Sequence, residues 1–218
     1  MENEIILICD FDGTIMDTSE SIIAGMIELF KNMRPDLNVD KKVVKNTIGK
    51  SLSDSFDLIS NQAMNEEEKE TAIKLYRENH SKFSRMYSKP FPHVREQLSL
   101  LKEKGVKLYV TSNKGEKALH SDLLRFEMAG FFEKILGDES AKSKKPNPEI
   151  FDKNIKNEIS TNSRVYVWGD TDIDIRFAKA ISAKSIYANY GYGDNDLCSK
   201  MDPDFTISTV SELSEIFR

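Results

Sequence analysis

The chain has 218 residues, a length that suits one large domain or one domain with a smaller insert. Hydrophobic residues make up 39% and charged residues 31%, an ordinary balance for a globular protein with a solvated surface. The net charge of −5 argues against a nucleic-acid partner, which favours a basic excess, and no apolar stretch is long enough to span a bilayer.

The first predicted strand covers residues 5–9, an apolar run that ends directly at Asp10 and Asp12. Two carboxylates so close together repel each other, and placing them at the end of a buried strand costs desolvation energy. We therefore expect both carboxylates to have a function.

A long helical stretch follows, because residues 16–88 carry helical patterns and no strand pattern. Asp17, with Glu20 three residues later, is expected to cap a first helix that Pro35 ends. Asn65 is expected to cap a later helix whose first turn is acidic, which suits the helix dipole.

From residue 89 onward strands alternate with helices, a pattern that predicts a parallel sheet covered by helices on both faces. Strands are expected at residues 106–111, 134–137, 165–168, 185–188 and 204–209. Gly105 is expected to close one helix, Asn147 and Pro148 to open another, and a final helix to follow the last strand. We therefore expect an α/β core domain of residues 1–15 and 89–218, and an inserted helical domain of residues 16–88.

Polar residues follow four of the predicted strands. They are Asp10 to Thr14, Thr111 to Asn113, Lys144 and Lys145, and Gly169 to Asp174. Ligands bind at the carboxyl ends of the strands in an open parallel sheet, so we expect these residues to meet at one edge. Clustered aspartates suit Mg²⁺, and the whole set suits phosphoryl transfer. The three histidines lie outside the clusters, which favours a carboxylate nucleophile.

Four motifs carry a resemblance to a known family: DFDGT (10–14), TSN (111–113), KP (145–146) and GDTDID (169–174). In this order they resemble the four motifs of the haloacid dehalogenase (HAD) superfamily, over essentially the whole chain. Order and spacing are most similar to the phosphoglycolate phosphatase branch. The resemblance implies a Rossmann-like parallel sheet with helices on both faces and an all-helical cap inserted after the first motif. It also implies a Mg²⁺-dependent phosphatase that hydrolyses a small phosphate monoester through an aspartyl-phosphate intermediate.

The resemblance further implies catalytic roles for four residues. Asp10 would be the nucleophile and a Mg²⁺ ligand. Asp12 would protonate the leaving oxygen and then activate water, while its backbone carbonyl binds the metal. Thr111 would hydrogen-bond the phosphoryl oxygens, and Lys145 would neutralise charge on them and on Asp10.

Five more residues receive metal-binding or substrate-binding roles from the resemblance. Asp170 would bind Mg²⁺, and Asp174 would lie on the metal or just behind its ligands. Ser112 and Asn113 would help to form the phosphate pocket, and Gly13 would shape the loop around it.

Lys50 is a candidate for substrate specificity. It lies beside Gly49, which is expected to form a turn, and before Ser51, which is expected to cap the next helix. In related capped enzymes a similar glycine turn approaches the active site, so Lys50 would meet an anionic leaving group. The other interpretation, that Lys50 is an ordinary solvated lysine, stays open.

Two other functions are alternatives to a phosphatase. A phosphosugar mutase of the same superfamily shares every core motif and would return the phosphoryl group to a sugar rather than to water. A phosphate-accepting signalling domain would need neither Asp12 as an acid–base group nor the long helical insert.

The expected partner is a small phosphorylated metabolite, with no nucleic acid and no membrane, and the sequence leaves monomer or homodimer open. Two cysteines, Cys9 and Cys198, do not make a disulfide framework and favour a reducing, cytoplasmic location. The acidic N-terminus does not resemble a secretory signal.

Overall fold

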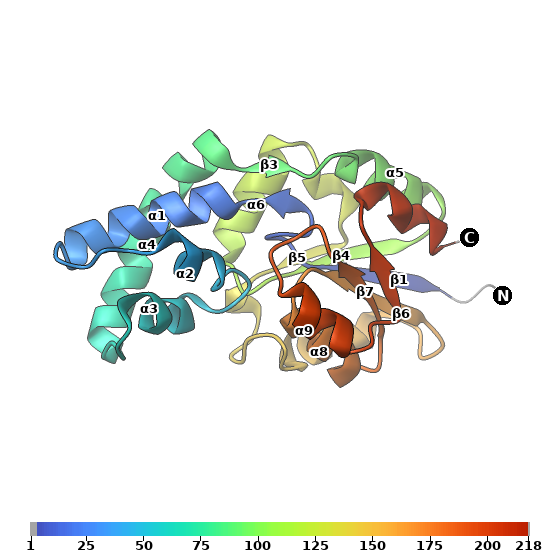
Figure 1. Cartoon of the computed structure of the whole chain (residues 1–218). Helices are drawn as coiled ribbons and strands as arrows, with labels where there is room; N and C mark the ends of the chain where they lie inside the picture. The colour runs from blue at the N-terminus through green and yellow to red at the C-terminus, as the bar shows by residue number, and fades with distance from the viewer. Residues whose placement is uncertain (1–3, 218) are drawn as a thin grey trace.

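Six parallel strands form the central sheet in the computed structural model, which describes residues 4–217. Their order across the sheet is β5-β4-β1-β6-β7-β8. Figure 1 shows the sheet in the right half of the view. In chain order they are β1 (Ile5–Cys9), β4 (Lys107–Thr111), β5 (Lys134–Leu136), β6 (Arg164–Gly169), β7 (Lys184–Ala188) and β8 (Phe205–Ile207). Because β1 pairs with both β4 and β6, Asp10 stands in the middle of the carboxyl edge.

Helices cover both faces of this sheet, which confirms the predicted α/β fold. Successive residues of β1 point to opposite faces, so Leu7 and Cys9 join one apolar core, while Ile6 and Ile8 join another. The first core is completed by α5 (Val94–Glu103), α6 (Glu116–Arg125) and the 3₁₀ helix η4 (Val210–Glu215). The second is completed by α7 (Glu149–Asn154) and α8 (Asp172–Ala180), with α9 (Asn195–Lys200) packed beside β7.

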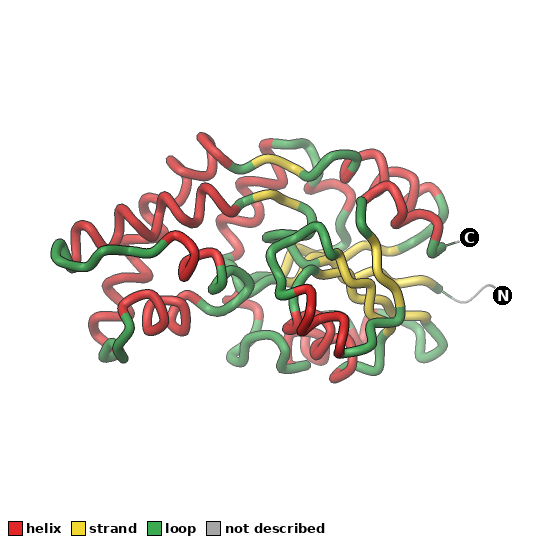
Figure 2. The backbone as a smooth tube through the Cα atoms, in the orientation of Figure 1, coloured by secondary structure: helices red, strands yellow, loops and turns green. Residues whose placement is uncertain are grey.

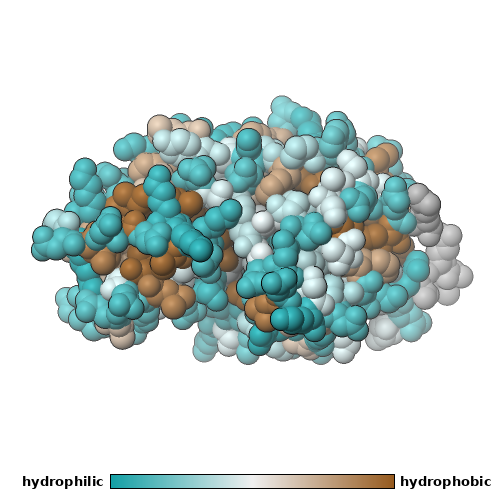
Figure 3. Space-filling model, in the orientation of Figure 1, coloured by the Kyte–Doolittle hydropathy of each residue, from teal (hydrophilic) through white to brown (hydrophobic). Residues whose placement is uncertain are grey.

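Four helices lie together beside the sheet, and we call them the helical region (Figure 2). They are α1 (Ser19–Met33), α2 (Lys41–Lys45), α3 (Leu52–Ser60) and α4 (Glu66–Tyr87). Met26, Phe30 and Phe56 belong to an apolar core of their own that is separate from the two cores of the sheet. Figure 3 shows apolar side chains gathered on the visible face of this region between polar ones. The division of the chain into two domains stays a prediction.

A two-stranded ribbon joins the helical region to the sheet. It is formed by β2 (Met16–Asp17) and β3 (Lys89–Pro90), which pair in antiparallel orientation. The expectation of a strand-free stretch over residues 16–88 is therefore wrong at its first two residues. The chain enters and leaves the helical region at neighbouring points, as an insertion into a sheet domain requires.

The ends of the helices agree with the sequence in most places. Asn65 forms a capping box with Glu68 at the start of α4, and the Ser51 hydroxyl accepts a hydrogen bond from the Asp54 amide at the start of α3. Gly105 follows α5 with a φ of +77°, the left-handed conformation that favours glycine.

Three details of the helix ends differ from the expectation. The N-cap of α1 is Thr18 rather than Asp17, because the Asp17 carboxylate accepts the hydroxyl of Tyr192 instead. Helix α7 begins after Pro148, and Asn147 accepts the amide of Glu149 at 3.0 Å. The last helix is 3₁₀ rather than α. Within residues 4–217 no helix combines the length and the apolar character needed to cross a membrane.

Candidate active site

The loop after β1 turns back sharply and carries the first two candidate residues. The Phe11 carbonyl accepts hydrogen bonds from the amides of Ile15 and Met16, and the Gly13 amide donates to the Met16 carbonyl. Gly13 has a φ of +89°, and a Cβ atom there would lie 2.2 Å from Asp170 Oδ2. Glycine is thus required for both the turn and the close approach to Asp170. Gly13 is not among the residues that line the cavity described below, and its contact with a substrate stays a prediction.

Lys145 lies between two carboxylates at the end of β1 and the start of α8. Its Nζ atom is 2.7 Å from Asp10 Oδ1 and 2.8 Å from Asp174 Oδ1, and all three side chains are buried. Burial alone would lower the pKa of Lys145, but the two carboxylates outweigh it and raise this pKa. The Asn113 carboxamide holds the lysine in place, accepting from the Lys145 amide at 2.9 Å and donating to the Lys145 carbonyl at 3.3 Å.

Asp10, Asp170 and Asp174 form a buried cluster in which one carboxylate oxygen of each lies within 4.8 Å of the others. Thr14 Oγ1 donates to Asp170 at 3.2 Å, and the Tyr192 amide donates to it at 2.7 Å. Burial raises the pKa of Asp170, and Asp10 and Asp174 raise it further. Burial likewise raises the pKa of Asp10, against the opposing effect of Lys145.

The cluster fits a divalent metal ion. Three carboxylates share one ammonium there, so the buried site carries excess negative charge unless protons or a cation balance it. An all-oxygen donor set is what Mg²⁺ prefers. Asp10, Asp170 and Asp174 would hold the ion through their carboxylates.

The Asp12 side chain has different partners from those of Asp10. Its Oδ1 atom accepts the hydroxyl of Thr18 at 2.7 Å and the ammonium of Lys114 at 2.8 Å. Both contacts are mostly buried, so the Asp12 carboxyl group is held in one orientation away from the acidic cluster. Sequence reasoning missed Lys114, although it directly follows the TSN motif at the end of a strand.

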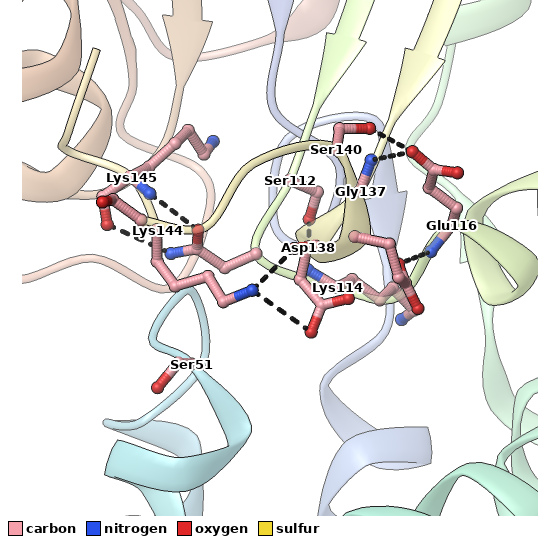
Figure 4. Close-up of polar contacts among 12 residues, drawn as sticks. Ser51, Ser112, Lys114, Glu116, Gly137, Asp138, Ser140, Lys144 and Lys145 are labelled. Carbon is pink, nitrogen blue, oxygen red and sulfur yellow. Dashed lines mark hydrogen bonds and ion pairs between the residues drawn. The ribbon is translucent and has the colours of Figure 1, made fainter. Parts of the chain in front are cut away.

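The expected contact of Thr111 with phosphoryl oxygens stays a prediction. This residue is the last of β4 and is fully buried, and its hydroxyl has no hydrogen-bond partner among the described residues. The next two residues, Ser112 and Asn113, line the cavity instead. Ser112 Oγ accepts the Lys114 amide at 3.2 Å, and Figure 4 shows Ser112 near the loops that carry Lys114 and Lys145. The hydroxyl groups of Thr111 and Ser112 are thus both candidates for a contact with a phosphoryl oxygen.

A cavity of about 680 Å³ lies between the loops of the sheet and the helical region. Asp10, Asp12, Ser112 and Asn113 line it from the sheet side, and residues of α1, α3 and α4 line it from the other. The turn before α3 reaches across, because Asn113 Nδ2 donates to the Gly49 carbonyl at 3.0 Å. Gly49 has a φ of +92°, as its turn requires.

Two further residues of the cavity bear on the sequence predictions. Lys50, beside the Gly49 turn, is exposed and lines the cavity, so the structure brings it to the site. His80 of α4 also lines it, although the sequence analysis placed the histidines outside the polar clusters. In the sequence, only the position of His80 one helical turn after Tyr76 indicates that both residues share a face of α4. That this face lies at the cavity follows only from how α4 packs in the structure.

Comparison with known proteins places this site in context. The model of the haloacid dehalogenase-like hydrolase family matches residues 7–188. A phosphoglycolate phosphatase from Aquifex aeolicus is 29% identical over 219 residues, covering 97% of this chain and 95% of that protein. The pyrophosphatase PpaX from Halalkalibacterium halodurans is 27% identical over 208 residues, covering 95% of this chain and 94% of that one.

Solved structures share the architecture. A haloacid dehalogenase-like family hydrolase from Streptococcus pneumoniae superposes with a TM-score of 0.84 at 20% identity, covering 99% of each chain. A β-phosphoglucomutase from Clostridium difficile superposes with a TM-score of 0.79 at 19% identity, covering 97% of this chain and 93% of that one. At such identities the likeness establishes the fold alone, so it does not separate a phosphatase from a mutase.

Proposed function

Because the chain belongs to the haloacid dehalogenase-like hydrolase family, we propose that it is a Mg²⁺-dependent phosphatase that hydrolyses a small phosphate monoester. The position of Asp10 is the observation that supports the proposal. Asp10 lines the cavity, forms an ion pair with Lys145 and belongs to the acidic cluster. A carboxylate in that position can reach a substrate while a cation and a metal ion balance its charge.

The reaction would take place in two steps at Asp10. First, an Asp10 carboxylate oxygen bonds to phosphorus while the bond from phosphorus to the leaving oxygen breaks, and Asp12 gives that oxygen its proton. Second, Asp12 takes a proton from water, whose oxygen bonds to phosphorus while the bond from phosphorus to the Asp10 oxygen breaks. Inorganic phosphate is released and the Asp10 carboxylate is restored. Lys114 and Thr18, which hold the Asp12 carboxyl group, would keep it aimed at the leaving oxygen.

The other residues would bind and neutralise the transferred group. Ser112 lines the cavity and would donate a hydrogen bond to a phosphoryl oxygen, beside the contact expected from Thr111. Asn113 would shape the pocket, because its Nδ2 atom already donates to the Gly49 and Lys145 carbonyls. Lys145 would balance charge on Asp10 and on the phosphoryl group. Asp10, Asp170, Asp174 and the Asp12 backbone carbonyl would hold the metal ion, which would supply further charge neutralisation.

The proposal also covers the cellular location of the protein and its small-molecule partner. We propose a cytoplasmic enzyme whose partner is a small phosphorylated metabolite. Both cysteines are buried free thiols, which agrees with a reducing compartment. Lys50, exposed at the cavity, would meet an anionic group of such a metabolite at the rim.

A screen of phosphate monoesters tests the proposal. The full-length protein is incubated with each ester and Mg²⁺, and inorganic phosphate is measured. Acid quenching during turnover, followed by peptide mass analysis, should find a phosphoryl group on Asp10. Steady release of inorganic phosphate supports transfer of the phosphoryl group to water. Transfer of the phosphoryl group to a sugar phosphate, with little free phosphate, would instead identify a mutase.

A further inference from the structure

The helical region contributes six apolar side chains to the cavity lining, beside nine polar or charged ones. The apolar side chains come from α1, from the turn before α3, from the first residue of α3 and from α4. They are Ile22, Met26, Ile48, Leu52, Ile73 and Tyr76. Contiguous apolar surface facing a cavity is what ligand sites use to bind apolar groups.

The volume of the cavity also favours a large ligand. Its volume of about 680 Å³ lies within the range of roughly 300–1,000 Å³ typical of sites that enclose a drug-sized ligand. A phosphoryl group esterified to a two-carbon acid would leave most of this space to water. Apolar surface left against water forgoes roughly 25 cal/mol per Å², so a larger apolar occupant would bind better.

The charged groups of the cavity do not single out an anionic leaving group. The two cations nearest the catalytic carboxylates are already paired, Lys114 with Asp12 and Lys145 with Asp10. Arg77 of α4, which also lines the cavity, pairs with Asp138 at 2.7 Å and with Glu139 at 3.3 Å. Lys50, Lys74 and Lys117 also line the cavity, as do the acids Glu70, Glu78 and Glu139, so basic and acidic residues are equal in number across the whole lining.

His80 is one of the neutral polar residues on the helical side of the cavity, with Thr47, Ser55 and Ser81. His80 lines the cavity one helical turn from Tyr76, with the two ring centroids 6.2 Å apart. Its Nε2 atom is buried and has no hydrogen-bond partner among residues 4–217. Burial, and next the nearby Lys114, lower the pKa of His80 to about 3, so the ring is neutral near pH 7. A neutral imidazole suits a hydroxyl, ether or carbonyl group of a ligand.

We propose that the leaving group of the substrate is a bulky, largely apolar alcohol that packs against α1, Leu52 and α4 and offers one neutral polar group to His80. This inference rests on the proposed phosphatase activity and names its substrate class. Any anionic group of the substrate would lie at the exposed rim, near Lys50.

A series of esters tests the inference. Initial rates are measured with Mg²⁺ for ethyl, butyl and hexyl phosphate, benzyl phosphate and 2-phosphoglycolate. We expect kcat/KM to rise roughly three- to fourfold for each methylene group that becomes buried, and 2-phosphoglycolate to be a poorer substrate than benzyl phosphate. A flat or falling series, with 2-phosphoglycolate preferred, would overturn the inference while leaving the phosphatase proposal intact. No phosphate release from any ester would overturn both.

Two leucines of α3 provide a matched pair of variants. Leu52 lines the cavity, whereas Leu58 is 51% exposed and lies outside it. Leu52→Ala should flatten the dependence of kcat/KM on chain length, and Leu58→Ala should leave it unchanged. Ile73→Ala on α4 is a second variant in case Leu52→Ala does not fold, as judged by thermal unfolding. Equal chain-length dependence in the wild type and in every folded cavity variant would overturn the inference.

Discussion

The ammonium of Lys145 lies 2.7 Å from Asp10 Oδ1, and only 2% of the lysine side chain is exposed to solvent. The pair joins two loops that are 135 residues apart in the chain. A buried charge that loses its partner is strongly destabilising, so this contact matters for the fold as well as for the proposed chemistry.

Lys145→Met should therefore lower both activity and stability. We expect kcat/KM for a phosphate monoester to fall at least a hundredfold, because charge on Asp10 and on the phosphoryl group is no longer neutralised. The free energy of unfolding, measured with urea, should fall by about 3 kcal/mol without added metal. The neighbouring Lys144, which donates to the Asp138 carbonyl and is 34% exposed, offers the control Lys144→Met. Equal effects of the two variants would contradict the role assigned to Lys145.

Asp10→Asn should abolish turnover and preserve the fold. The amide fills the same volume but cannot attack phosphorus, and loss of a nucleophile costs orders of magnitude in rate. Circular dichroism and phosphate release measure the two effects. Asp172→Asn is the matched control, because Asp172 pairs with exposed Arg176 and lies outside the acidic cluster. Near-normal turnover by purified Asp10→Asn would exclude Asp10 as the nucleophile.

Mg²⁺ should stabilise the protein as well as activate it. Binding at saturating concentration to the folded state alone should raise the melting temperature by roughly 5 °C. Asp170→Asn should remove this shift without lowering the stability of the metal-free protein, because it relieves repulsion within the acidic cluster. EDTA should stop phosphate release, and Ca²⁺ should inhibit it by drawing more oxygen ligands onto the ion. Full activity in metal-free buffer would argue against the proposed site.

His80 should make the stability of the fold sensitive to mild acid. Its pKa is about 3 in the folded protein, lowered from 6.5 chiefly by burial, so the unfolded chain takes up a proton first as the pH falls. Stability is therefore lost progressively below pH 6.5 and down to about pH 3. Compared with His80→Gln, the wild type should lose about 2 kcal/mol more between pH 7 and pH 5. Urea unfolding at both pH values measures the difference, with His120→Gln on the exposed face of α6 as the control. Parallel pH profiles for His80→Gln and wild type would refute the assignment.

Lys50 should matter only for substrates that carry a second charge. Lys50→Ala should lower kcat/KM for an anionic monoester by roughly tenfold, the effect of one lost charge-assisted contact, and should barely change hydrolysis of p-nitrophenyl phosphate. Lys41→Ala, on an exposed lysine of α2 away from the cavity, controls for the general loss of positive charge. Unchanged rates on every anionic ester would make Lys50 an ordinary solvated lysine.

Much of the catalytic edge was predictable from the sequence, for a physical reason. Strands buried on both faces read as short apolar runs, and the polar residues after such runs must meet because parallel strands end at one edge. That reasoning located Asp10 after β1, Lys145 after β5 and Asp170 after β6, and the structure brings all three to one site. The caps at Ser51 and Asn65 were also predictable, because they depend only on neighbouring residues.

Contacts that depend on the direction of a side chain were decided only by the tertiary structure. A shift of one residue at the end of a strand sends the side chain to the other face, which is why Ser112 rather than Thr111 lines the cavity. Tyr192, far along the chain, takes the Asp17 carboxylate that local spacing assigned to a helix cap. Lys114 reaches Asp12 only because β4 lies beside β1. The packing of α1 and α4 over the sheet likewise decides which apolar side chains of these helices line the cavity. Helical periodicity predicts which face of a helix is apolar, but it does not predict which of those residues lie beside a cavity.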